Sequence, residues 1–174
     1  MNLYLRFLRI VFKIFFAKKL SPLAESQLSF RAWPHDCDIY FHMTNSRYPA
    51  MMDLGRTYLL GQAKIIGKIL KNKFLLVPVS SEISYIREIK PFQKFTLHSR
   101  LISWDKTYWF VEQKFQSANT LHAVATIRGL TMKNGKKVPF QDVLNLLDEE
   151  IKSPEMPQRI IAWQNLLDEK KKVS

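Results

Sequence analysis

Residues 36–48 read DCDIYFHMTNSRY and stand directly before a strongly patterned helix. Two carboxylates, an imidazole and a carboxamide therefore crowd the start of that helix. A helix N-terminus presents unpaired backbone N–H groups and the positive end of the helix dipole, so it can polarise a carbonyl group or hold developing negative charge. A carboxylate beside it could direct a water molecule at that carbonyl, which makes this stretch the first candidate for a functional site.

Apolar residues recur every three to four positions after this stretch, from Ser46 to about Leu70, and predict one long helix with a buried side. Pro49 is tolerated because it lies in the first turn, where the backbone N–H lacks an intrahelical partner. Gly55 lies on the apolar side although glycine lowers helix propensity, which predicts a close approach of backbone or ligand at this point.

The segments around the helix have the pattern of strands. A first strand is expected at residues 27–33, and four more stretches rich in apolar, β-branched and aromatic residues predict consecutive antiparallel strands at 74–88, 92–104, 107–117 and 120–132. Asn134-Gly135 is a strong turn signal, and Pro139 can start a helix over residues 140–151. This order predicts an α+β fold in which an antiparallel sheet wraps around one long central helix.

The composition fits one folded domain, since 174 residues with 47% hydrophobic content can bury a proper core. The single cysteine, Cys37, excludes an intrachain disulfide and a cysteine-rich zinc site, and favours a reducing, cytoplasmic compartment. The aspartates on either side of Cys37 should raise the pKa of its thiol, which argues against a nucleophilic cysteine. No histidines, cysteines and carboxylates have metal-ligand spacing, so no metal is expected.

Residues 1–20 are almost wholly apolar or basic and contain no acidic residue, in a chain whose net charge is +12. Arg6, Arg9 and Lys13 share one helical stripe opposite a broad apolar face. Basic side chains interrupt every long apolar run, so this helix is expected to lie on an anionic membrane surface, and neither a membrane span nor a signal peptide is favoured. A helix packed on its own domain or on a partner chain is the alternative.

These features divide the chain into four parts. They are a basic amphipathic helix at residues 1–20, a linker at 21–25 that contains Ser-Pro, a folded domain at 26–152, and a C-terminal tail with a short helix at 153–174.

The motif at residues 36–48 resembles the hot-dog-fold acyl-CoA thioesterases, particularly the 4-hydroxybenzoyl-CoA thioesterase-like family. Members of that family carry an Asp-x-Asp pair shortly before an Asn/His-x-x-Tyr helix opening, and the resemblance covers roughly residues 25 to 150. It implies the hot-dog fold, hydrolysis of an acyl-CoA to free acid and CoA, and a homodimer or homotetramer. No cofactor is implied, because coenzyme A is part of the substrate, and a fatty or other apolar acyl group is expected.

The resemblance makes Asp38 the catalytic carboxylate, either as general base for water or as a nucleophile that forms a mixed anhydride. Its structural alternative is a turn aspartate that accepts backbone N–H bonds. Asp36 is expected to shape the loop or to raise the pKa of Asp38. His42 matches the Asp-x-x-x-His spacing of plant acyl-carrier-protein thioesterases, although Tyr40 replaces their usual asparagine; it would orient the carbonyl or the water, or cap the helix. Asn45 is expected near the reacting carbonyl or as a helix cap.

Substrate binding is expected from the start and the first turns of the helix, at Ser46, Arg47, Tyr48 and Met52. Backbone N–H groups around residues 46–48 would polarise the thioester carbonyl. Tyr48 is expected mainly to pack at the helix start. Met52, with Met51 and Leu59, would line an apolar acyl pocket beside the helix.

Other functions fit parts of the sequence. A non-catalytic, membrane-associated acyl-binding or scaffolding protein is the main alternative, because the substitution at Tyr40 leaves room for it. A hot-dog hydratase or dehydratase would need an Asp-x-Asn-Pro-x-His motif, and this chain has neither the asparagine nor the proline. Nucleic-acid binding is not expected, since the basic residues are concentrated in an apolar segment and no reader motif is present.

Overall fold

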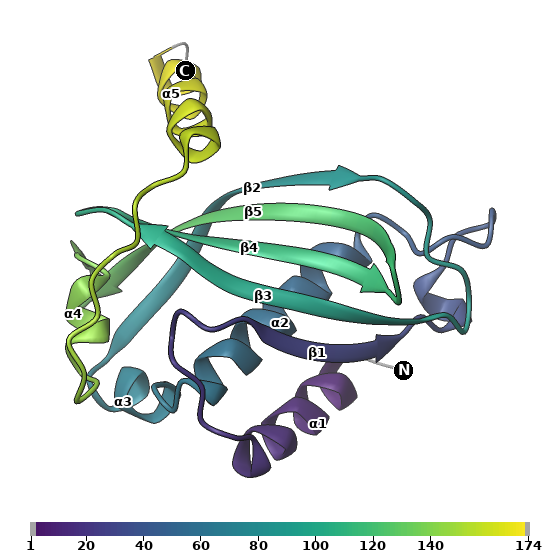
Figure 1. The fold of residues 1–174 in the computed structure, drawn as a ribbon, viewed down its shortest axis with the longest axis horizontal. Coiled ribbons are helices and arrows are strands. Elements are labelled where there is room, and N and C mark those ends of the chain that lie inside the picture. Colours follow the sequence, from purple (N-terminus) through teal and green to yellow (C-terminus); the bar gives the residue numbers. More distant parts are fainter. Residues whose placement is uncertain (1–2, 173–174) are drawn as a thin grey trace.

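The structure is a computed structural model that describes residues 3–172, and its core is a six-stranded sheet curled around a central helix (Figure 1). The strands are β1 (Ser26–Arg31), β2 (Phe74–Tyr85), β3 (Lys94–Trp104), β4 (Tyr108–Ser117), β5 (Thr120–Lys133) and β6 (Lys136–Val138). The helices are α1 (Leu3–Phe16), α2 (Arg47–Gln62), α3 (Ile66–Lys71), α4 (Gln141–Leu144) and α5 (Gln158–Lys172), with a short 3-10 turn at Pro34–Asp36.

The sheet has the strand order β1-β3-β4-β5-β2, with β6 paired to β5, and all of its pairs are antiparallel. The prediction of consecutive antiparallel strands is confirmed for β3, β4 and β5, which tight turns connect. It is wrong for β2, which pairs with β5 at the far side of the sheet instead of with β3. Turn signals fix hairpins, but the longer connection after β2 lets the chain cross the end of the sheet. The expected α+β hot-dog arrangement is confirmed.

Helix α2 lies against the concave face of the sheet, and its closest approach is at Gly55. A Cβ atom at this position would lie 2.6 Å from Leu97 Cδ2 and 2.7 Å from Gln113 Nε2. The buried Gln113 side chain donates to the backbone oxygen of Met52 at 3.0 Å and to Ser99 Oγ at 2.8 Å. The predicted close approach is thus between helix and sheet, and one satisfied polar group joins the two.

The prediction of one helix from Ser46 to about Leu70 is wrong, because the chain breaks after α2. Lys64 adopts a φ of 54°, the left-handed conformation that commonly ends a helix. Helix α3 starts afresh at Ile66. Ala63, Ile65 and Ile69 are all buried in the same core, so the apolar period continues across the break and hides it from a sequence pattern.

The C-terminal part also differs from the prediction. The helix expected at 140–151 is a single turn, α4, after which the chain still buries Ile151 in the main core. The expected short helix of the tail is the 15-residue α5, apart from residues 173–174, which lie outside the described part. Ile160 packs against Ile102 and Phe110, and Arg159 pairs with Glu112 on the sheet. Burial favours a raised pKa for Glu112, but hydrogen bonds from Arg159 and Lys114 outweigh it and lower this pKa.

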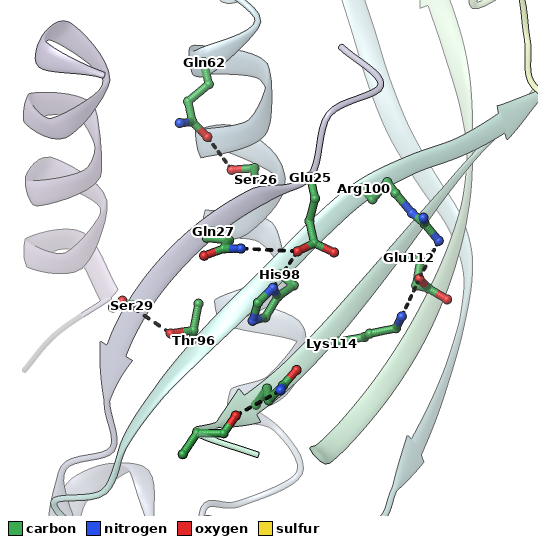
Figure 2. Close-up of polar contacts among 12 residues, drawn as sticks. Glu25, Ser26, Gln27, Ser29, Gln62, Thr96, His98, Arg100, Glu112 and Lys114 are labelled. Atoms are coloured by element: carbon green, nitrogen blue, oxygen red, sulfur yellow. Dashed lines mark hydrogen bonds and ion pairs between the residues drawn. The ribbon is translucent and has the colours of Figure 1, made fainter. Parts of the chain in front are cut away.

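A polar network covers β1 and its neighbours (Figure 2). The Glu25 carboxylate contacts His98 Nδ1 at 2.7 Å and accepts a hydrogen bond from Gln27. On the other side of β1, Ser26 Oγ donates to Gln62 Oε1 of α2 at 2.6 Å. Strand β1 is therefore fixed both to β3 and to the central helix.

Helix α1 lies beside α2 and along β1 (Figure 1). Ile10 and Ile14 pack against Leu28 and Leu54, and Gly61 gives Ile14 room to do so. The packing of this helix on its own domain, which the sequence analysis gave as the alternative to a membrane surface, is therefore observed. The opposite, apolar face of α1 remains exposed. The predicted segment began at residue 1, and residues 1–2 lie outside the described part. No helix within residues 3–172 is long and apolar enough to cross a membrane.

Candidate active site

Asp36 is the structural centre of the loop that joins β1 to α2. Its side chain is 1% exposed, pairs with Arg6 of α1, and accepts a hydrogen bond from the Trp33 backbone N–H at 2.9 Å. Arg47 Nε lies 3.4 Å from its other oxygen, and its backbone oxygen accepts the Thr44 N–H at 2.9 Å. The prediction that Asp36 shapes the loop is confirmed.

Asp38 is exposed and closes a tight turn at the tip of this loop. Its Oδ1 accepts the backbone N–H groups of Tyr40 at 2.9 Å and of His42 at 3.2 Å. Phe41 within the turn has a φ of 59°, a sparsely populated conformation for a bulky residue. Within residues 3–172, Oδ2 of Asp38 forms no hydrogen bond or ion pair. One oxygen thus holds the turn and the other faces solvent.

His42 is exposed and lies near Glu88, a residue that the sequence reasoning missed. The hydrogen bond Met43 N–H to Ile89 O, at 2.9 Å, holds the loop after β2 beside the Asp38 loop. The backbone N–H of Glu88 lowers the pKa of its carboxyl, and the charge of His42 contributes to this shift. No motif marks Glu88, because its proximity depends on where β2 ends in the folded sheet.

The start of α2 carries no side-chain cap. Ser46 occupies the N-cap position without a capping hydrogen bond, and Asn45 is exposed, so the prediction that Asn45 or His42 caps the helix is wrong. The Arg47 N–H donates to Thr44 O at 2.9 Å, whereas in the described chain the N–H groups of Ser46 and Tyr48 donate to no acceptor. The helix start therefore keeps open donors, as a site for a polarised carbonyl requires.

Three of the predicted substrate-binding residues serve the loop or the core. Tyr48 is buried, with ring centroids 5.0 Å from Tyr85 and 4.8 Å from Phe115, which confirms its packing role. Burial, with a contribution from Tyr85, raises the pKa of Tyr48 to about 12, so its hydroxyl stays protonated at neutral pH. Arg47 donates to His35 O at 3.1 Å, and Met52 lies in the main core. A direct part of these residues in substrate binding stays a prediction.

Cys37 lies half-buried between the two aspartates. Burial raises the pKa of its thiol, and the charges of Asp36 and Asp38 raise it further, as the sequence predicted. The thiol therefore stays protonated and is a poor nucleophile. In the part of the chain that the structure describes, no three metal-binding side chains come together.

An apolar cavity of about 210 Å³ lies between the second half of α2, the sheet and α4. Leu59, Trp109 and Phe140 contribute to its wall, and Asp53 and Arg56 also line it. Leu59 is thus on the cavity wall as predicted, whereas Met51 and Met52 are buried in the core and do not line it. The cavity begins six residues along the helix from Arg47, which is about 9 Å at about 1.5 Å per residue.

Comparison with known proteins gives consistent results. The profile of the "Thioesterase-like superfamily" matches residues 32–164. "Probable thioesterase YBR096W" of Saccharomyces cerevisiae is 34% identical over 110 residues, which cover 61% of this chain and 47% of that protein. "Protein THEM6" of Xenopus laevis is 27% identical over 141 residues, covering 81% of this chain and 68% of that protein. This chain thus spans about half the length of the yeast relative.

Among solved structures, the probable thioesterase YbaW from Escherichia coli superposes with a TM-score of 0.64 at 18% identity. The superposition covers 71% of this chain and 98% of the bacterial one. It shows a shared fold.

Removing the Asp36 carboxylate should destabilise the protein, because Arg6 would keep a buried charge without its partner. We expect Asp36→Ala to lower the free energy of unfolding by about 3–5 kcal/mol in urea titrations. Glu150→Ala is the matched control, since Glu150 and its partner Lys152 are both exposed, and it should change this free energy by less than about 0.5 kcal/mol. Equal effects of the two substitutions would contradict the role given to Asp36.

Proposed function

The chain belongs to the thioesterase-like superfamily, and from this premise we propose that it is an enzyme that hydrolyses acyl-CoA thioesters to a free acid and CoA. The observation that carries the proposal is that the two oxygens of the Asp38 carboxylate have different surroundings. Oδ1 is held by two backbone N–H groups of its own turn, which fixes the orientation of the side chain. Oδ2 is left for chemistry, in the loop that leads directly into an uncapped helix start.

Asp38 acts by one of two routes. As general base, Oδ2 removes a proton from water, the oxygen of that water attacks the thioester carbonyl, and the C–S bond breaks. The proton then passes to the departing CoA thiolate. As nucleophile, Oδ2 attacks the carbonyl itself and displaces the thiolate, and water hydrolyses the resulting mixed anhydride. Both routes give one acid and one thiol for each water consumed.

The start of α2 and the residues before it supply the rest of the site. The unpaired N–H groups of Ser46 and Tyr48 donate to the thioester oxygen as it gains negative charge. His42, near Glu88, and Asn45 present exposed polar side chains on the same loop and orient the carbonyl or the attacking water. Arg47 holds the loop through Asp36 and His35 while the reaction proceeds.

The acyl group is apolar, and a fatty acyl chain is the favoured class. Support comes from the cavity beside α2, whose wall is formed mostly by aliphatic and aromatic side chains. An apolar chain gains about 0.8 kcal/mol for each methylene that leaves water, so such a cavity favours longer chains up to its capacity. Coenzyme A enters as part of the substrate, with no further cofactor.

The active protein is a homodimer or homotetramer. In the single chain the tip of the Asp38 loop exposes Ile39, Tyr40 and Phe41, by 85%, 73% and 71%. Strand β2 leaves one edge of the sheet open beside this loop. Exposed apolar residues beside an open edge mark a contact surface, and a second copy there would exclude water from the site.

The enzyme is placed on a membrane surface by α1.

Replacing Asp38 by asparagine should abolish turnover and preserve the fold. The amide oxygen of Asp38→Asn still accepts the N–H groups of Tyr40 and His42, so only the basic, anionic oxygen is lost. We expect kcat for thiol release from acyl-CoA substrates of several chain lengths to fall about 10²- to 10⁴-fold. Asp148→Asn, at a fully exposed carboxylate, should leave kcat unchanged.

Two outcomes would count against this proposal. If Asp38→Asn retains the parent's kcat, another group performs the hydrolysis. If the parent releases no thiol but binds acyl-CoA in equilibrium titrations, the protein is the non-catalytic acyl-binding alternative.

Filling the cavity should shorten the preferred acyl chain. We expect Leu59→Trp to lower kcat/KM for long-chain acyl-CoA about 15-fold relative to a short-chain substrate, which corresponds to two excluded methylenes at about 0.8 kcal/mol each. Leu70→Trp is the control, because Leu70 is exposed and lies outside the cavity. An unchanged chain-length profile in Leu59→Trp would show that the acyl group binds elsewhere.

A further inference from the structure

A basic groove of about 480 Å³ lies between α1 and β1, away from the Asp38 loop tip. Its basic lining residues are Arg6, Arg9 and Lys13 from α1, Arg31 from β1, and Lys94 from β3. Among residues 3–172, no acidic side chain lines it. We refer to this feature as the α1–β1 groove.

Within the described residues, four of these five cations have no anionic partner. Arg6 is neutralised by Asp36, but none of the ion pairs within residues 3–172 involves Arg9, Lys13, Arg31 or Lys94. The sequence predicted that Arg6, Arg9 and Lys13 would all reach lipid. For Arg6 that is wrong, because its guanidinium is turned inward and buried.

Two of the cations without an anionic partner are paired on the neighbouring strands β1 and β3. Arg31 lies directly opposite Lys94 in the β1–β3 pairing. Like charges at directly opposed positions are unfavourable in a sheet, unless an anion lies between or above them. Arg31 Nη1 also donates to Phe92 O at 3.0 Å, which fixes the guanidinium near the groove. The pairing is an arrangement that a bound phosphate would stabilise.

The groove borders the exposed apolar face of α1. Arg9 is one helical turn from Leu5 and from Phe12, so their side chains are neighbours on the helix surface. Phe12, Phe15 and Phe16 are 65%, 76% and 77% exposed, although each is a large apolar side chain. A ligand that contacts both the groove and this apolar face must combine an anionic group with an apolar part.

We propose that the α1–β1 groove binds the phosphate of an anionic phospholipid while the exposed face of α1 enters the surrounding bilayer. Charge complementarity and the adjoining apolar face both select this occupant, since a free phosphate would leave the phenylalanines in water. Trp33, at the groove wall and 6.0 Å from the ring of Phe92, has the amphipathic character that favours the bilayer interface. The site rests on the proposed membrane placement but is independent of the proposed hydrolysis.

The test is sedimentation of the full chain with lipid vesicles at low ionic strength. Vesicles of phosphatidylcholine alone are compared with vesicles that also contain phosphatidylserine or a phosphoinositide. The parent should bind the anionic vesicles, and Arg9→Gln combined with Lys94→Gln should weaken this binding about 30-fold, because each basic residue near an anionic bilayer contributes about fivefold. The matched control combines Lys71→Gln with Lys106→Gln, two exposed lysines outside the groove, and should bind within about threefold of the parent.

Further measurements distinguish the other ligands that could bind the groove or the exposed face of α1. Phe12→Ser with Phe15→Ser should also abolish sedimentation if the apolar face enters lipid. If the groove variant and the lysine control lose binding equally, only net charge matters and the groove is not a site. If inorganic phosphate displaces the parent from anionic vesicles more strongly than sodium chloride of the same ionic strength does, and the phenylalanine variant still sediments with the vesicles, the groove binds phosphate without entry of α1 into lipid. A third outcome is that the parent does not sediment with any vesicles. If light scattering then shows an oligomer for the parent and a monomer for the phenylalanine variant, α1 binds a second copy of the chain.

Thiol release from a short-chain, water-soluble acyl-CoA is measured on the same samples. Normal turnover in a groove variant that no longer sediments would separate lipid binding from catalysis. A failure of hydrolysis in the parent would leave the sedimentation result intact, so each proposal can fail without the other.

Discussion

The buried ion pair between Arg6 and Asp36 is the constraint on which the rest of the site depends. It joins α1 to the loop that carries Asp38. The Asp36 carboxylate also accepts a hydrogen bond from the Trp33 backbone N–H and lies near the Arg47 guanidinium. Two charges that leave water lose hydration free energy, and they recover it only if their geometry and further hydrogen bonds are good. Because Asp36 meets partners from α1, from α2 and from its own loop, the loop has one favoured position relative to α2.

This constraint explains why α1 presents its apolar face outward. A helix with an arginine stripe and an apolar face would ordinarily bury the apolar face. Here Arg6 and Ile10 turn inward together, since Arg6 finds its carboxylate and Ile10 finds Leu28 and Leu54. Phe12, Phe15 and Phe16 lie on the other side and stay exposed. An exposed apolar face is thus a consequence of holding the loop, and it becomes useful only if a bilayer or another chain covers it.

Much of the fold followed from local patterns, and the failures have physical causes. The β3–β5 hairpins, the close approach at Gly55 and the loop-shaping part of Asp36 were all predictable from spacing and residue type. The break at Lys64 was not, because residues on both sides of it face the same core. The pairing of β2 with β5 depends on the long connection 86–93, whose Lys90-Pro91 turn signal does not distinguish a hairpin from a crossing of the sheet. The position of Asp38 in a turn before α2 was predictable from residue type and spacing, and its catalytic part stays a prediction. The neighbourhood of Glu88 and the inward turn of Arg6 require tertiary contacts that no local pattern encodes.

In the proposed mechanism, the Arg6–Asp36 pair positions the loop from which Asp38 acts on a thioester. This role is tested most directly by a double-mutant cycle in kcat/KM for acyl-CoA hydrolysis, with Arg6→Ala, Asp36→Ala and both together, at a temperature where circular dichroism shows all four proteins folded. We expect each single substitution to lower kcat/KM and the double substitution to lower it no further than the worse single one, because the two side chains act as a unit. Losses that multiply in the double variant, or single variants as active as the parent, would contradict it.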